Sequence, residues 1–155
     1  MHAFRFDSLR FREQFFVWSL RVGCARVVVN DERTEGMLSE AFGAARCIRA
    51  LPPVLELAAA LVYVSQEAGV SPDVRCTSCR FLGGDELRLL HTVTALQCGQ
   101  CAAAERCYAH LRRTSCRVLI EHCSSVAVAF AELGWRFALV ARVASPATEA
   151  QRRLH

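Results

Sequence analysis

The segment Pro52–Gly69, PPVLELAAALVYVSQEAG, carries a complete set of helix signals. Two prolines open it, where proline fits the first turn of a helix, and the same pair ends any helix that precedes them. Apolar residues then recur at spacings of three and four and so share one face: Val54, Leu57, Leu61 and Val64. Gly69 marks the end. The segment predicts an amphipathic helix that buries this face in a core.

The same spacing recurs on both sides of this segment and predicts further helices, about six in all. Earlier in the chain, one helix is expected after a cap at Asp7 or Ser8, and a second after Thr34. Later, helices are expected from a cap at Asp85 to Gly99, over about 101–113 and over about 115–133. The expected inward stripes are Phe11, Phe15, Trp18 and Val22; Leu38, Ala41, Ala45 and Ile48; Leu87, Leu90, Val93 and Leu96; Ala104, Tyr108 and Leu111; and Cys116, Leu119, Cys123, Val126, Phe130 and Leu133.

Two kinds of segment depart from this helical period. Residues 70–84 show no period and contain Pro72 and a Gly-Gly pair, which predicts a loop. RVVVN (26–30) and WRFALV (135–140) are β-branched or alternating and predict a minor two-stranded ribbon. The expected fold class is therefore mainly α: a single-domain bundle of about six helices with a cysteine-containing loop over 70–84.

Length and composition fit one folded domain. The chain has 155 residues, of which 53% are hydrophobic and 22% charged, so enough apolar surface exists to offset chain entropy. We expect the domain to cover 1–144 and a flexible tail to cover 145–155.

Charged residues interrupt every apolar stretch, which predicts a cytoplasmic protein without a membrane span. The N-terminus mixes charged residues among its apolar ones and lacks the apolar core of a secretory signal. The longest apolar stretches are interrupted by Glu56 and Glu132. In a reducing compartment, nine cysteines serve metal binding, redox chemistry or plain packing. Cys116 and Cys123 lie on an inward stripe, and we interpret them as small core residues.

Two CxxC pairs, Cys76/Cys79 and Cys98/Cys101, are separated by 18 residues, a spacing typical of zinc sites. Here the spacer predicts a helix about 19 Å long, which would hold the pairs at its opposite ends. If the next helix folds back, its end returns to the level of the first pair. We therefore predict a structural zinc site formed by Cys76, Cys79, Cys107 and His110, with Cys98 and Cys101 as alternative ligands.

The second pair admits a different chemistry. CGQC (98–101) resembles, over four residues, the C-G-x-C active site of thioredoxin-like proteins, in which a helix N-terminus favours the thiolate. The resemblance implies dithiol redox chemistry at Cys98 and Cys101. Separately from the resemblance, an iron–sulfur cluster is the alternative cofactor to zinc. A helix rather than a strand is expected to precede the motif, which argues against a redox role. For both pairs, the alternative remains that the CxxC spacing arose by chance in an alanine-rich chain and has no function.

The positive charge gives only weak information on partners. All 19 basic residues are arginine, as a GC-rich coding bias would produce, and the net charge is +4. Five arginines lie among aromatic residues near the N-terminus: Arg5, Arg10, Arg12, Arg21 and Arg26. A helix with Arg10 and Arg21 facing outward would touch nucleic acid or an acidic partner, or form an ordinary solvated face.

No catalytic motif is present: the chain lacks GxSxG, Walker A and GxGxxG patterns and has no carboxylate pair spaced for acid–base work. The expected function is that of a non-catalytic interaction or regulatory module that binds another protein and is stabilised by zinc. The alternatives are a nucleic-acid-binding regulator and a thiol-redox or iron–sulfur protein. The high apolar content also leaves a homodimer open.

Overall fold

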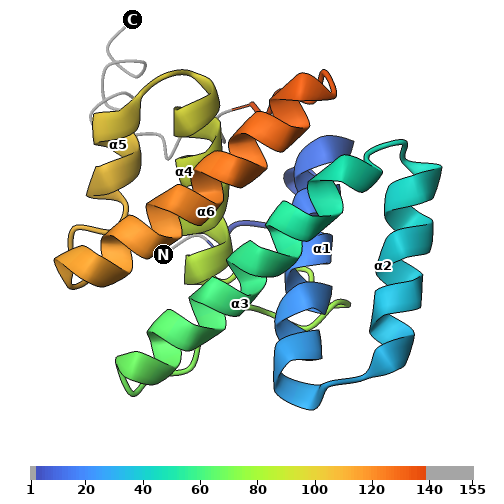
Figure 1. Ribbon diagram of the computed structural model, residues 1–155, viewed down its shortest axis with the longest axis horizontal. Helices are drawn as coiled ribbons and strands as arrows, with labels where there is room; N and C mark the ends of the chain where they lie inside the picture. The colour runs from blue at the N-terminus through green and yellow to red at the C-terminus, as the bar shows by residue number, and fades with distance from the viewer. Residues whose placement is uncertain (1–2, 139–155) are drawn as a thin grey trace, which may run out of the picture.

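Six α-helices and two short 3-10 helices follow one another along residues 3–138, the part of the chain that the computed structural model describes (Figure 1). They are η1 (Phe6–Ser8), α1 (Phe11–Val29), α2 (Glu32–Ala44), η2 (Ile48–Ala50), α3 (Leu51–Glu67), α4 (Gly84–Gln97), α5 (Cys101–Arg106) and α6 (Arg113–Glu132). These residues contain no strand. The prediction of a mainly α bundle of about six helices is confirmed.

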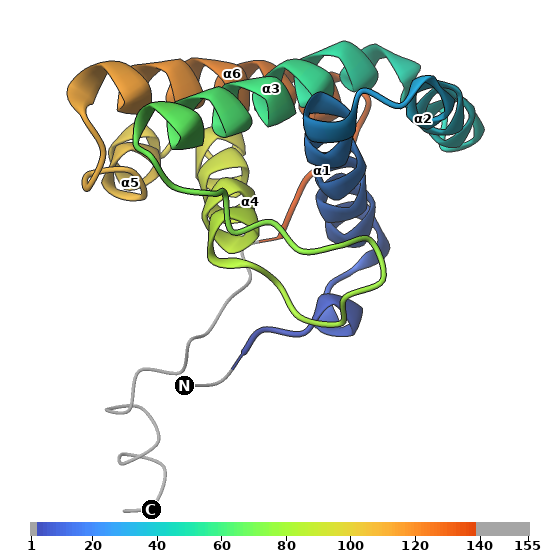
Figure 2. The same cartoon turned by 90° about the horizontal axis from the view of Figure 1, so that it is seen from below.

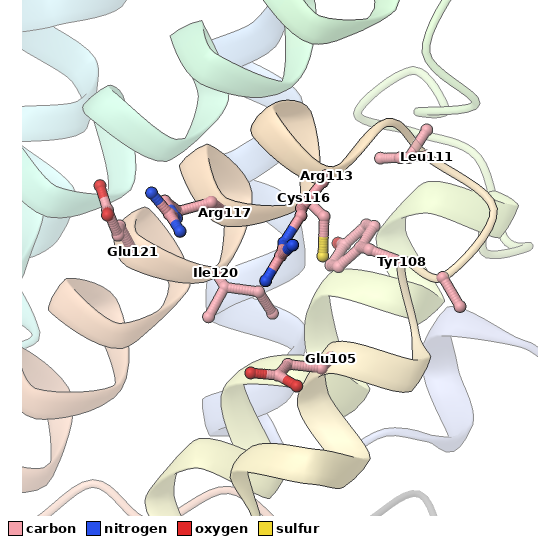
Figure 3. A pocket seen from close by; sticks show the side chains of 9 residues that line it. Glu105, Tyr108, Leu111, Arg113, Cys116, Arg117, Ile120 and Glu121 are labelled. Atoms are coloured by element: carbon pink, nitrogen blue, oxygen red, sulfur yellow. The ribbon is translucent and has the colours of Figure 1, made fainter.

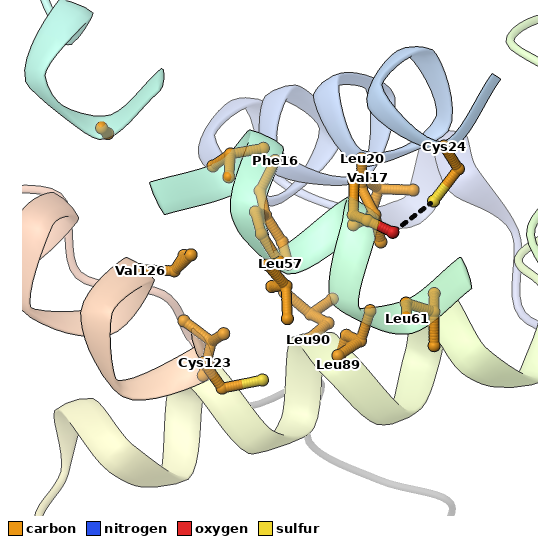
Figure 4. Close-up of a cluster of buried hydrophobic side chains, with 14 of the residues drawn as sticks. Phe16, Val17, Leu20, Cys24, Leu57, Leu61, Leu89, Leu90, Cys123 and Val126 are labelled. Atoms are coloured by element: carbon orange, nitrogen blue, oxygen red, sulfur yellow. Dashed lines mark hydrogen bonds between the residues drawn. The ribbon is translucent and has the colours of Figure 1, made fainter. Parts of the chain in front are cut away.

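The helices are arranged in two layers. In Figure 2, α3 and α6 lie side by side in one layer, and α1 and α4 stand beneath them, with α2 at one edge. Where the layers meet, side chains from all four helices are fully buried (Figure 4). Members of this core are Phe16, Val17, Leu20, Leu57, Leu89, Leu90, Cys123 and Val126. Cys123 is thus a core residue, as its stripe predicts.

The ends of α3 match its sequence signals. The prolines lie in its first turn, and the predicted stripe from Val54 to Val64 is buried. At the other end Gly69 adopts φ +70°, and the amide of Val70 donates to the carbonyl of Ser65 over 3.0 Å. Only glycine takes this left-handed conformation at little cost, so the helix ends here.

This helix is also the one membrane-span candidate in the described part of the chain. Residues Ile48–Glu67 are long and apolar enough to cross a membrane by length and composition alone, with a mean hydropathy of 1.5. More than half of the window, 56%, is buried inside the fold. Because core helices pass the same test, this is weak evidence for a span.

The predicted ribbon is wrong in its first half. Residues 26–29 continue α1, and Asn30 ends it in the left-handed region with its amide on the carbonyl of Arg26 (2.7 Å). Their β-branched side chains favour strands only where a partner edge exists. Residues 135–138 form no strand. The amide of Phe137 donates to the Gln97 side chain and that of Ala138 to the Glu13 side chain, each over 2.8 Å. Residues 139–140, the domain limit at 144 and the tail 145–155 lie outside the described residues.

Several predicted helix boundaries shift. The first helix starts after Arg10, because 6–8 form η1. The fifth ends at Arg106, seven residues before the predicted end, and turns follow. The second buries Leu38 and Phe42, while Ile48 is 50% exposed. The apolar period predicts that these elements are helical but not where they end: residues 107–110 form turns, and Ile48 lies in η2, outside α2.

Candidate functional site

Arg21 of α1 and Glu86 of α4 form an ion pair in the interior, and both side chains are 0% exposed. The Arg21 Nε donates to Glu86 Oε1 over 2.7 Å, and its Nη2 donates to Oε2 over 3.0 Å. Such a two-point contact is the strong form of this interaction. The expectation that Arg21 faces outward is wrong: one face of α1 packs on α3 and another meets α4, so the guanidinium is enclosed.

The pair also fixes the loop between α3 and α4. Arg21 donates to the carbonyls of Cys79 (2.8 Å) and Phe81 (2.9 Å). Glu86 accepts from the amides of Arg75 (2.8 Å) and Gly83 (2.8 Å). A long loop without helix or strand is thereby held at four backbone groups, and the cost of burying the two charges is offset by full hydrogen bonding.

The bond from Gly83 to Glu86 is also the cap of α4. The sequence prediction placed the cap at Asp85, but Gly83 precedes the helix and the Glu86 side chain reaches back to its amide. Asp73 closes the loop onto the same turn, since its carboxylate accepts from the amide of Gly84 over 2.6 Å. A Cβ added to Gly83 would lie 2.0 Å from the carbonyl oxygen of Asp73, so only glycine fits there.

The first CxxC pair lies on this anchored loop as a tight turn. The amide of Cys79 donates to the carbonyl of Cys76 over 3.1 Å, and the Sγ of Cys76 lies 3.6 Å from the Oγ of Ser78. The hydrogen bond from the Ser78 side chain, followed by its backbone amide, lowers the pKa of Cys76. Cys76 is exposed and Cys79 half-buried, so the turn presents two sulfur atoms close to the surface.

The other predicted ligands do not join this turn. Cys107 is half-buried at the end of α5 and donates to the carbonyl of Ala103 (3.4 Å), while His110 lies in the exposed turn that follows. His110 does return to the level of the α4 N-terminus, where it lines a cavity of about 260 Å³ with Val70 and Asp85. Within residues 3–138, no three His, Cys, Asp or Glu side chains are grouped so as to hold a metal ion. The zinc site stays a prediction.

Cys98 and Cys101 lie at the opposite end of α4. Cys98 is the residue after the helix and Cys101 begins α5, with Gly99 at φ +72° between them. Both are exposed. A helix thus leads into CGQC, as expected, and the 14 residues of α4, about 20 Å of helix, lie between the two CxxC pairs in the chain.

A cavity of about 430 Å³ lies between α5, α6 and the turn that joins them (Figure 3). Four charged residues line it: two glutamates, Glu105 and Glu121, and two arginines, Arg113 and Arg117. Cys116 lines it as well, and burial raises the pKa of its thiol. A thiol held in its neutral form is a poor nucleophile.

An apolar groove lies on the surface of α1. Phe6, Phe11, Gln14, Phe15 and Trp18 line an open groove of about 190 Å³, here called the aromatic groove. Gln14 fixes its base by donating to the carbonyls of Phe6 (3.3 Å) and Leu9 (3.1 Å). Phe11 is 64% exposed although the sequence prediction placed it in the core. The helix is apolar on more than one side, and the neighbouring helices cover only part of it.

The arginines near the N-terminus are largely paired. Arg5 pairs with Asp7, Arg21 with Glu86 and Arg26 with Glu35. Arg10 and Arg12 are exposed, and the ion pairs of the described residues do not involve them. Arg12 donates to the carbonyl of Gly134 (3.0 Å) with its guanidinium 5.8 Å from the Trp135 ring.

Comparison with protein families, with curated proteins and with solved structures finds no significant match to this chain, so no relative informs its function.

Proposed function

We propose that the chain is a protein-interaction module that holds an acidic amphipathic helix of a partner protein in the aromatic groove. The observation that carries the proposal is the exposure of Phe11, 64%, at the lip of a groove lined by three further aromatic rings. Aromatic side chains that form an open apolar surface are typical anchors of protein interfaces.

The shape of the groove supports a helical ligand. Phe11, Phe15 and Trp18 follow one another at helical spacing, so the groove runs along α1. Phe15 is held in place by Phe42 and Trp135, with ring centroids at 4.8 and 5.5 Å. A rigid floor of this kind binds the apolar stripe of a helix at a low entropy cost.

The charge beside the groove supports an acidic ligand. Arg10 and Arg12 flank Phe11 in sequence and are exposed. They would attract glutamates that border the apolar stripe of the ligand, which speeds association more than it raises affinity. A nucleic acid would need a longer row of arginines, and Arg5, Arg21 and Arg26 are paired with carboxylates.

The experiment uses a fluorescein-labelled synthetic helix with leucines at i, i+3, i+4 and i+7 and glutamates at the other positions. Its polarisation is followed as the protein is added. We expect saturable binding that weakens at least about 10-fold in Phe11→Ala, as removal of a central aromatic anchor commonly does. Tyr63→Ala is the matched control, because Tyr63 is 61% exposed on α3 and does not line the groove.

Two further ligands make the result specific. The same helix with lysines in place of glutamates should bind more weakly because Arg10 and Arg12 repel it. A single-stranded oligothymidine should bind more weakly than the acidic helix at 150 mM salt, near physiological ionic strength. Equal binding of the acidic helix by the Phe11→Ala and wild-type proteins would overturn the proposal, as would a preference for the oligonucleotide.

A further inference from the structure

The turn Cys76–Cys79 has the features of a two-thiolate metal clip. Its ends are closed by the hydrogen bond from the Cys79 amide to the Cys76 carbonyl, and the Ser78 hydroxyl lies beside the Cys76 sulfur. CxxC on one turn supplies two sulfur ligands at a spacing that tetrahedral zinc accepts. Hydrogen bonds to a ligand sulfur are the usual support of such a site.

The turn is held rigidly, although it lies at the surface. The carbonyl of Cys79 accepts from buried Arg21, and the amide of Arg75, just before Cys76, donates to buried Glu86. Both ends of the turn are therefore fixed to an ion pair with no exposed surface. A site fixed in this way loses little entropy when it binds a metal.

Zinc in a structural site takes four ligands, and the described part of the chain supplies two here. Cys98 and Cys101 lie at the other end of α4, a helix about 20 Å long, and Cys107 packs against the core. Two further thiolates at matching geometry are available from the same turn of a second copy, because a two-fold axis repeats every residue.

We propose that one zinc ion bridges two copies of this chain, bound by Cys76 and Cys79 of each. Four thiols lose their protons to the solvent as the ion binds, and no electron is transferred. The resulting ZnS₄ centre has a charge of −2.

Charged and apolar neighbours of the turn fit this arrangement. Arg75 and Arg80 directly flank the motif and are exposed, and Arg75 also pairs with Asp73 over 3.4 Å. Arg80 of each copy therefore adds positive charge close in sequence to the negative centre. Phe81 is 47% exposed two residues beyond Cys79 and supplies an apolar contact beside the metal. The pair Cys98/Cys101 has no charged residue within two positions and is the natural comparison.

The test measures zinc by mass spectrometry and molar mass by light scattering on the full chain, purified without added metal and then given one equivalent of zinc. We expect half a zinc per chain and a dimer that a chelator converts to monomer. The double variant Cys76→Ser, Cys79→Ser should lose at least about 10-fold in zinc affinity and remain monomeric. Its helical circular dichroism should match the wild type, which shows that it folds.

The double variant Cys98→Ser, Cys101→Ser is the matched control and should keep both zinc and the dimer. One zinc per chain in a monomer would overturn the proposal, because the site would then be completed within one chain. Loss of zinc from the Cys98/Cys101 variant, or a wild-type protein that takes up no zinc, would overturn it as well. None of these readouts involves the aromatic groove, so the two proposals fail independently.

Discussion

Replacing Glu86 with alanine should be among the most destabilising single changes in this protein. The carboxylate accepts four hydrogen bonds, from Arg21 Nε and Nη2 and from the amides of Arg75 and Gly83. Its removal leaves a buried guanidinium without its counter-charge and two amides without an acceptor. Breaking a buried ion pair by removing one partner costs about 3–5 kcal/mol, and each orphaned amide adds about 1–3 kcal/mol.

Urea unfolding followed by circular dichroism gives the change in the free energy of unfolding. We expect Glu86→Ala to lose at least about 5 kcal/mol, about 3 kcal/mol from the broken pair and about 1 kcal/mol from each of the two amides. The matched control is Arg26→Ala. Arg26 lies on α1, as Arg21 does, and its pair with Glu35 of α2 (3.4 Å) is more exposed, so its loss should cost less than about 1 kcal/mol.

A double variant separates the role of the pair as a loop anchor from its role as a pair. Replacing both partners, Arg21→Met with Glu86→Leu, removes the unpaired charge, and for an isolated buried pair such a change is often neutral. Here it still orphans two amides and the carbonyls of Cys79 and Phe81. At about 1 kcal/mol each, it should lose about 4 kcal/mol. A double variant as stable as the wild type would refute the reasoning.

Further outcomes follow from the same structure. Gly83→Ala should lose about 1–3 kcal/mol in urea unfolding, because its Cβ meets the Asp73 carbonyl at 2.0 Å, whereas Gly36→Ala on α2, with no atom within 4 Å, should gain up to about 1 kcal/mol. Burial raises the pKa of Cys24 to about 12 and of Cys47 to about 11, whereas the pKa of exposed Cys76 is lowered. Iodoacetamide at pH 8 should therefore modify Cys76 fast and leave Cys24 and Cys47 unmodified in the native protein. Rapid labelling of Cys24 would contradict the packing. Burial lowers the pKa of His91, so the unfolded chain binds a proton there more readily than the folded one. The free energy of unfolding should therefore fall as the pH drops below about 6.5, the usual histidine pKa. A His91→Gln variant should show a smaller fall in its urea midpoint between pH 7.5 and 5.

The local pattern predicts most of the helices because helix signals act over a few residues. The prolines and Gly69 fix both ends of α3, and Gly99 ends α4 as expected. Residues 26–29 show where the local pattern fails. Their β-branched side chains favour a strand, but residues 3–138 offer no strand beside them, and α1 continues through them.

The candidate site was harder to predict, because it depends on contacts between residues distant in sequence. Arg21 and Glu86 are 65 positions apart, and each has an ordinary local interpretation, a solvated arginine and a capping glutamate. A loop of this length with few apolar residues needs an anchor, and that was the available signal. Zinc was predicted to hold this loop. The structure shows a buried ion pair bonded to four backbone groups of the loop, and the zinc site stays a prediction. Phe11 was predicted to lie in the core. The spacing of apolar residues predicts which side chains share a face of the helix, but it does not predict whether another helix covers that face.

The hydrogen bonds of Arg21 and Glu86 suffice to order the loop before α4, and hydrogen exchange of two amides tests this most directly. The amides of Arg75 and Gly83 donate to Glu86. In protein treated with a chelator, both should exchange at least about 100-fold more slowly than in an unstructured peptide, which corresponds to about 3 kcal/mol. Exchange at the rate of an unstructured peptide, with protection restored only by added zinc, would contradict the account.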